Sequence, residues 1–390
     1  MNSETETKFQ EYMNKGEKPF DYEKYLILDQ KERVKAILKG ENPPPYELEI
    51  QASPYCDAEC RHCFGTYHLD RLGNKLDNRE AIDRLVEQVV SFDYKGFVVD
   101  NVKFCGSTGD PLSNNMIREM VDSFYEKKGK RKIIMFTNGL KLGLEETRGK
   151  ALEVLSKVNR LNLSLDAGST PTLWRVKPGA LNKAVKLERI LEGAKELQDK
   201  GINVTVGYVI TAYNYYDIAN AAKIVKEHGL GLIKYRVDMF DRRVSRAYGN
   251  TIVDLLHKAK SYEEENFKVV QIHDEKDIRN EDEAHFSSKE QGLKCFTNRF
   301  WASIGSNGEV YPCGHVSMVG MDSYGNILEK DFPDIWNGKR RKKVLESLPC
   351  AKCQVCSPSS LRRNSLMSFL SELERETAEK LINEIVYEKK

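Results

Sequence analysis

Two kinds of hydrophobic pattern alternate along most of this 390-residue chain. Runs of apolar and β-branched residues, typical of strands, occupy Glu47–Ala52, Val98–Cys105, Lys132–Thr137, Leu161–Asp166, Asn203–Ile210 and Leu232–Phe240. Segments with apolar residues at helical spacing lie between them, at Arg79–Ser91, Ser113–Lys127, Asn182–Lys200 and Tyr216–His228. Six strands that alternate with helices predict βα units and a parallel sheet that curls toward a barrel. The expected fold class is therefore α/β, with a partial (β/α)6 barrel of the TIM type, whose active site lies at the carboxyl ends of the strands.

The pattern changes on both sides of this barrel, which we place at residues 46–265. Residues 1–45 are charged and helical, and they end at Gly40 and the proline run Pro43–Pro45. Residues 266–290 read as a charged linker that contains one extra strand, Phe267–Ile272. We expect a small cysteine-rich domain at residues 291–358 and a C-terminal helix at residues 359–390.

Composition excludes some classes of function. The 61 basic and 59 acidic residues leave a formal charge of +2, so bulk charge does not indicate nucleic-acid binding. The chain has no signal-peptide pattern and no apolar run long enough to cross a membrane, which predicts a cytoplasmic protein. Nine cysteines gathered in two groups, with Cys105 between them, then indicate metal binding rather than disulfides.

The first cysteine group lies in the polar stretch from Cys56 to Cys63. Cys56, Cys60 and Cys63 are separated by three and then two residues, so a short loop can present all three thiolates to an iron-sulfur cube. Three ligands leave one iron open to a small chelating molecule. The alternative is zinc, which needs a fourth ligand such as His62 or His68.

This spacing after a strand-like run, with His62 just before the last cysteine, resembles the radical S-adenosylmethionine (radical SAM) superfamily. The resemblance implies a reduced [4Fe-4S] cluster that cleaves bound SAM to methionine and a 5'-deoxyadenosyl radical, which then abstracts hydrogen from a substrate. It also implies an external electron donor such as flavodoxin or ferredoxin.

The segment Cys105–Leu112, after the second strand, resembles the Gly-Gly-Glu-Pro segment by which the superfamily holds the SAM amino group. Gly109, Asp110 and Pro111 would take that role, although Asp110 stands where the family has Glu. A glycine-rich turn before a helix can also be a plain loop. Cys105 itself is expected near the barrel mouth, either as a small core residue or as a hydrogen donor to a substrate radical.

Polar residues also follow the later strands. Asn138 after the third strand, with Ser164 and Asp166 at the end of the fourth, resembles family segments that line the cofactor pocket. Asn214, after the fifth strand, is a further candidate for cofactor binding. Arg236 alternates with apolar residues on the sixth strand, which predicts a contact to the SAM carboxylate or to substrate. The alternative is an edge strand with one solvated face.

The second cysteine group comprises Cys295, Cys313, Cys350, Cys353 and Cys356. Trp301–Pro312 reads as a hairpin with a two-residue Asn-Gly turn, which would bring Cys295 and Cys313 together. The region resembles the Twitch or SPASM auxiliary-cluster domain of radical SAM enzymes. We expect one auxiliary [4Fe-4S] cluster on Cys295, Cys313, Cys350 and Cys353, with Cys356 as a substitute or spare; a zinc ribbon is the alternative.

The resemblance therefore implies a radical SAM oxidoreductase or epimerase that acts on a small polar compound, such as a sugar or aminocyclitol. Two alternatives stay open: a maturase of a ribosomally made peptide, and a non-catalytic iron-sulfur or zinc protein. The residues expected to take part in catalysis are Cys105, Asp166 and Arg236.

Overall fold

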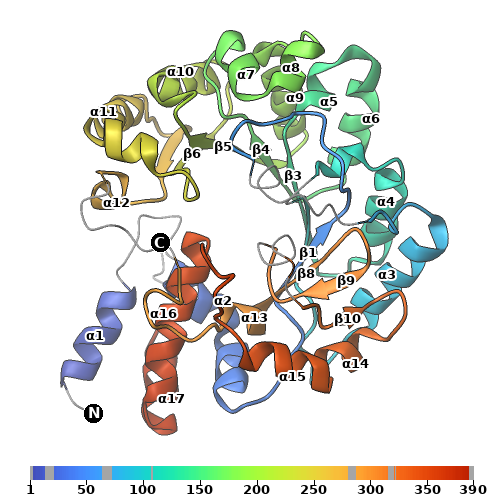
Figure 1. Cartoon of the computed structure of the whole chain (residues 1–390), viewed down its shortest axis with the longest axis vertical. Coiled ribbons are helices and arrows are strands. Elements are labelled where there is room, and N and C mark those ends of the chain that lie inside the picture. Colours follow the sequence, from blue (N-terminus) through green and yellow to red (C-terminus); the bar gives the residue numbers. More distant parts are fainter. Residues whose placement is uncertain are drawn as a thin grey trace.

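One ten-stranded sheet organises the molecule (Figure 1). The structure is a computed structural model that describes residues 3–13, 22–63, 73–106, 109–279, 287–314, 320 and 322–385. Its strands are β1 (Glu47–Gln51), β2 (Asn101–Cys105), β3 (Lys132–Thr137), β4 (Arg160–Ser164), β5 (Asn203–Ile210), β6 (Leu232–Val237), β7 (Lys268–Gln271), β8 (Trp301–Ile304), β9 (Glu309–Tyr311) and β10 (Gly325–Asn326). Their order is β10-β9-β8-β1-β2-β3-β4-β5-β6-β7, so the predicted parallel sheet is confirmed.

The sheet extends beyond the six predicted strands at both edges. β7 pairs parallel with β6, and its residues Val269 and Val270 are buried. The extra strand that was expected in a linker therefore belongs to the barrel sheet. β8 pairs parallel with β1 at the other edge, and β9 and β10 continue the sheet in antiparallel fashion. The cysteine-rich segment is thus built directly onto the barrel.

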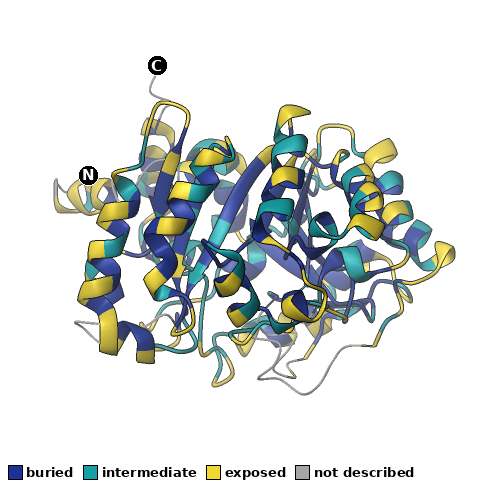
Figure 2. Cartoon of the chain, turned by 90° about the horizontal axis from the view of Figure 1, so that it is seen from above, coloured by how far each residue is buried: buried dark blue, intermediate teal, exposed yellow. Residues whose placement is uncertain are grey.

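Helices cover the outer face of the curled sheet (Figures 1 and 2). Each turns an apolar face inward; in α3, for example, Ile82, Leu85, Val86 and Val89 are buried. The helices after the first two are α3 (Arg79–Ser91), α4 (Ile117–Lys127), α5 (Leu140–Gly143), α6 (Glu145–Leu155), α7 (Thr170–Val176), α8 (Pro178–Asn182), α9 (Leu187–Asp199), α10 (Ile218–Glu227), α11 (Arg243–Lys260), α12 (Glu275–Arg279), α13 (Thr297–Phe300), α14 (Phe332–Asn337) and α15 (Lys339–Glu346). In the part of the chain that is described, no helix combines the length and apolar character needed to cross a bilayer.

The two ends of the chain form a second hydrophobic core. It is built by α1 (Ser3–Met13), α2 (Tyr22–Leu38), α16 (Pro358–Glu372) and α17 (Arg375–Glu384). Phe9, Ile27, Leu370 and Ile382 are buried in it, together with Phe300 of α13. The helical segments predicted separately at each terminus therefore pack into one unit beside the barrel (Figure 1).

The β8–β9 hairpin is confirmed, but its turn differs from the predicted two-residue loop. Ile304 pairs with Val310, and the Gly305 N–H donates to the Glu309 carbonyl at 2.9 Å. Three residues, 306–308, therefore form the loop, and Gly308 adopts φ +83° at its end. This left-handed position explains why the turn uses glycine.

Candidate functional site

The first cysteine group lines a cavity of about 290 Å³ at the carboxyl ends of the strands. Cys56, Cys60 and Cys63 all reach it from the loop that follows β1. The loop is anchored to the segment around α7 and α8, because Arg61 N donates to the Val176 carbonyl and Gly179 N to the Ala58 carbonyl. A Cβ on Gly179 would lie 1.9 Å from the Asp57 carbonyl oxygen, so only glycine permits this approach.

The three thiols suit an iron-sulfur cluster. Asn138 Nδ2 lies 3.5 Å from Cys56 Sγ and 3.2 Å from Asp57 Oδ1, so its amide supports the loop and a sulfur ligand together. Burial raises the pKa of Cys56 to about 11 and that of Cys60 further, so binding a cluster must release protons. Among the described residues, no group of three or more His, Cys, Asp or Glu side chains is arranged to hold a metal ion. A four-iron cluster is larger and takes its ligands on different irons.

Asp110 joins the loops that follow β2 and β3. Its carboxylate accepts hydrogen bonds from Asn138 N at 2.7 Å, Thr137 Oγ1 at 2.9 Å and Leu112 N at 3.0 Å. Burial raises its pKa to about 6 in spite of these donors. Since the carboxylate is engaged within the protein, a ligand amino group would have to use nearby backbone carbonyls.

The glycines beside Asp110 are required by close backbone contacts. A Cβ on Gly109 would lie 2.0 Å from the Ser53 carbonyl oxygen, and one on Gly106 equally close to the Gly109 oxygen. Gly109 lines the cavity, whereas Pro111 begins a short 3-10 helix, Pro111–Ser113, and is absent from the described lining. Ser107 and Thr108 lie outside the described residues.

Asp166 is the centre of a buried charged group. Its Oδ2 lies 3.2 Å from Lys177 Nζ and 3.8 Å from His62 Nε2, and Oδ1 accepts from Val209 N at 2.8 Å. Burial acts to raise its pKa, but Lys177, together with the other groups that favour the charged carboxylate, outweighs burial and the pKa is lowered. For His62 the effect of burial has the opposite sign: burial disfavours the charged form and lowers the pKa, so a neutral imidazole is favoured. Asp166 thus lines the cavity while its carboxylate holds Lys177 and His62; the sequence pattern gave no signal for Lys177.

The other predicted residues divide between the cavity and its support. Ser164, Arg236 and Cys105 line the cavity. Asn214 does not, since its side chain accepts from Thr211 N at 2.7 Å and donates to the carbonyls of Asp166 and Val209. Asn214 is fully buried and fastens the loop after β5, so its position does not support the expected cofactor contact.

An ionic group on β1 and β2 was not predicted from the sequence. Lys103 Nζ lies 3.0 Å from Glu47 Oε1 and 3.1 Å from Glu49 Oε2, and it stands over the Trp301 ring at 4.6 Å. Glu49 also hydrogen-bonds the Cys105 thiol, and burial together with the Glu49 charge raises the pKa of Cys105 well above its usual range. Charged residues alternating with apolar ones in β1 and β2 could have indicated this, as they did for β6.

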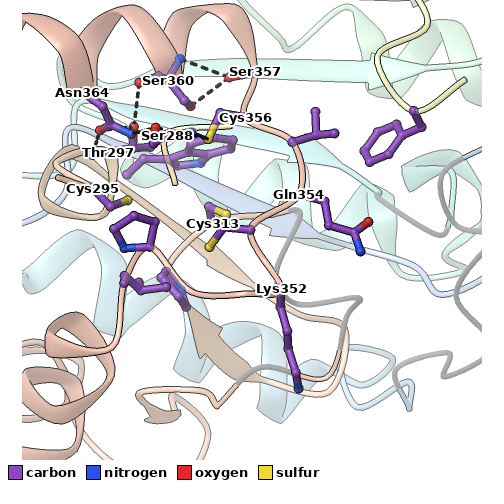
Figure 3. Close-up of a pocket in the computed structure, with 17 residues that line it drawn as sticks. Ser288, Cys295, Thr297, Cys313, Lys352, Gln354, Cys356, Ser357, Ser360 and Asn364 are labelled. Atoms are coloured by element: carbon purple, nitrogen blue, oxygen red, sulfur yellow. Dashed lines mark hydrogen bonds between the residues drawn. The ribbon is translucent and has the colours of Figure 1, made fainter. Parts of the chain in front are cut away.

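A second and smaller cavity, of about 50 Å³, is lined by Cys295, Cys313, Cys353 and Cys356 (Figure 3). Cys350 is not part of its described lining, and the Cys350 N–H lies 3.4 Å from Cys353 Sγ. Of the two roles expected for Cys356, substitute ligand or spare, its place in the lining is compatible with the substitute.

The C-terminal helix takes part in this second cavity. Asn364 of α16 accepts hydrogen bonds from Phe296 N and Thr297 N, both at 2.7 Å, and donates to Ser288 Oγ at 2.8 Å (Figure 3). Ser288 in turn contacts Cys356 Sγ at 3.4 Å. The helix thereby braces two of the cysteine-bearing segments.

The two cavities share one lining residue among those described, Phe240, which follows β6. Its neighbours Asp238 and Arg236 line the first cavity, and β6 is an internal strand because β7 pairs with it. A molecule in the first cavity beside Phe240 would thus lie between the two cysteine groups.

Comparison with protein-family models gives two matches. Residues 50–227 match the model described as the radical SAM superfamily, and residues 295–357 match SPASM, described as an iron-sulfur cluster-binding domain. The first range contains Cys56, Cys60 and Cys63, and the second contains all five C-terminal cysteines.

Solved structures share the fold at low sequence identity. Streptococcus suis SuiB bound to its precursor peptide SuiA superposes with a TM-score of 0.59 and 20% identity, over 86% of this chain and 74% of SuiB. SuiB bound to S-adenosylmethionine gives 0.58 and 21%, over the same shares. The structure of anSMEcpe with bound AdoMet gives 0.54 and 15%, over 88% of this chain and 95% of that one.

Proposed function

The chain belongs to the radical SAM superfamily and carries a SPASM iron-sulfur domain, and from this premise we propose an enzyme that abstracts hydrogen from a polar substrate held between two clusters. The observation that carries the proposal is the pair of cysteine-lined cavities that share Phe240. The first would hold the SAM-binding [4Fe-4S] cluster and SAM, and the second the auxiliary cluster.

In the first cavity, Cys56, Cys60 and Cys63 would ligate three irons. A reduced [4Fe-4S] cluster held there would supply the electron that cleaves SAM to methionine and a 5'-deoxyadenosyl radical, which would take hydrogen from substrate. Asn138 supports the loop that would carry the cluster, and Asp110 joins two loops that would face SAM. Arg236 offers a guanidinium to the SAM carboxylate or to an acidic group of the substrate.

In the second cavity we assign Cys295, Cys313, Cys353 and Cys356 as cluster ligands, because these four line it. Cys350 would be the spare cysteine. Four cysteine ligands complete the coordination of a cube, so this cluster would accept or deliver electrons rather than bind substrate. Separate Cys350→Ala and Cys356→Ala variants test the assignment: only the second is expected to lose the auxiliary cluster's iron.

For the substrate we propose a small polar compound that undergoes dehydrogenation or epimerisation. Support comes from the charged interior: Arg236 and Asp238 line the cavity, and Glu49, which pairs with Lys103, contacts the lining residue Cys105. Burial and the neighbouring cations lower the pKa of Lys234, on the same strand face as Arg236, to about 8. Polar groups on a substrate would replace the water that such a wall needs. An external donor of the flavodoxin or ferredoxin type would supply the electron.

A peptide substrate is the second candidate. It is favoured by two solved structures of the same fold, SuiB bound to precursor peptide SuiA and anSMEcpe with bound Cp18Cys peptide. A short precursor-peptide gene beside the gene for this chain would favour it over a small molecule.

The experiment is anaerobic reconstitution of the full chain with iron and sulfide, then iron counting and assay of 5'-deoxyadenosine with SAM and a reductant. We expect about eight irons per chain, as two cubes contain, and SAM cleavage. Stoichiometric zinc with no SAM cleavage would instead identify a non-catalytic metal protein.

A further inference from the structure

The chain contains three tryptophans, and they differ in whether the indole N–H has a hydrogen-bond acceptor. Trp174 Nε1 donates to the Val185 carbonyl at 2.7 Å, and Trp336 Nε1 donates to the Pro43 carbonyl at 2.8 Å. Trp301 Nε1 is buried and has no hydrogen-bond partner among the described residues. A buried N–H without an acceptor is destabilising, so this group needs an explanation.

Trp301 is also the tryptophan that lines the second cysteine cavity. It begins β8, directly beside β1, and 9% of its surface is exposed. A charged group contacts the indole ring. Lys103 Nζ stands 4.6 Å from the ring centroid and forms ion pairs with Glu47 and Glu49. The indole is thus fixed between the barrel's ionic group and the cavity lined by Cys295, Cys313, Cys353 and Cys356.

We propose that the Trp301 Nε1–H donates a hydrogen bond to a sulfur of the auxiliary cluster and thereby raises its reduction potential. This inference rests on the proposed function, which places a cluster in that cavity. Sulfur atoms of iron-sulfur clusters accept hydrogen bonds, and such bonds are one of the factors that set the potential. A donor stabilises the reduced cluster more than the oxidised one, because the reduced cluster is more negative.

In this arrangement the Trp301 indole would contact the cluster directly and change its reduction potential. The hydrogen bond would satisfy the orphan N–H only when the cluster is present. Lys103 on the ring keeps the indole in place without adding an uncompensated charge, since two carboxylates surround its ammonium group.

The test is the Trp301→Phe variant, which keeps an aromatic ring for Lys103 and removes the N–H. It is made in the full chain with Cys56, Cys60 and Cys63 changed to Ala, so that only the auxiliary cluster contributes, and the potential is measured by EPR-monitored redox titration. We expect about a tenfold loss in the equilibrium constant for one-electron reduction, a potential lower by about 59 mV. Trp336→Phe is the matched control, because that indole is also buried but lies outside the cavity lining and its N–H is already bonded.

A second readout does not depend on the potential. After exchange into D2O, pulsed ENDOR of the reduced cluster is expected to lose a proton coupling, and this exchangeable coupling is expected to be absent from Trp301→Phe in ordinary water. A fully loaded Trp301→Phe variant with the parent's potential and the parent's exchangeable coupling would overturn the inference and assign the N–H to a buried water. If the parent chain binds no second cluster at all, the proposed function fails first, and iron counting reveals it.

Discussion

Removing the Lys177 ammonium group should strongly destabilise the barrel. Lys177 and Asp166 have side-chain exposures of 0% and 2%, with Nζ 3.2 Å from Oδ2. Lys177 also donates to the Ser164 and Leu165 carbonyls. Lys177→Met therefore leaves a buried carboxylate and two carbonyls without their cation. Breaking a buried pair in this way costs about 3–5 kcal/mol, a large part of the roughly 5–15 kcal/mol that holds a native protein together.

The assay is urea unfolding of the metal-free full chain, followed by circular dichroism. The control is Lys200→Met, which removes a shorter ion pair, Nζ to Glu196 Oε1 at 2.8 Å, whose side chains are 50% and 40% exposed. Solvated pairs contribute about 0–1 kcal/mol, so this variant should unfold almost as the parent does.

Adding Asp166→Asn to Lys177→Met provides the decisive comparison. The amide removes the uncompensated charge, so the double variant should be more stable than Lys177→Met alone. Two results would refute the view that this buried charge pair stabilises the end of β4. One is an equally small loss of unfolding free energy in Lys177→Met and Lys200→Met; the other is a double variant no more stable than Lys177→Met.

Three further predictions concern the proposed chemistry and its pH dependence. Cys105→Ala should accumulate dehydrogenated or deuterium-labelled by-product if Cys105 returns a hydrogen atom; an unchanged product distribution at normal turnover would make Cys105 a core residue. Cys295→Ala with Cys313→Ala should leave SAM cleavage detectable but stop product formation, with circular dichroism as the check on folding; full product yield would make the auxiliary cluster structural. Asp110 has a pKa of about 6 in the fold against an ordinary 3.8, so the native state binds its proton more tightly than the unfolded chain. Relative to Asp110→Asn, the wild type should lose roughly 2 kcal/mol of unfolding free energy as the pH rises from about 4 to about 6; a pH-independent difference would contradict this.

The sequence predicted those parts of the fold in which local pattern and packing agree. The six strands from β1 to β6 were located because their buried runs alternate with amphipathic helices. β7 was found as a strand but misplaced, since its sequence does not show which strand it pairs with. β8 pairs with β1 across some 250 residues of chain, a long-range contact that periodicity does not encode.

The candidate site shows the same division. Cysteine spacing indicated both groups, and strand ends indicated Asp110, Asp166 and Arg236. The engagement of the Asp110 carboxylate by three donors, however, depends on how two loops meet in space. Lys177 could not be found from sequence, because its partner Asp166 lies on another element and a lone lysine normally predicts a surface position.

We propose above all that a cluster with one open iron, on the loop after β1, cleaves SAM. The full chain with Cys56, Cys60 and Cys63 changed to Ala should, after reconstitution, form no 5'-deoxyadenosine from SAM and reductant while keeping about four irons in the auxiliary site. Undiminished formation of 5'-deoxyadenosine by this variant would contradict the assignment of the first cavity as the reaction centre.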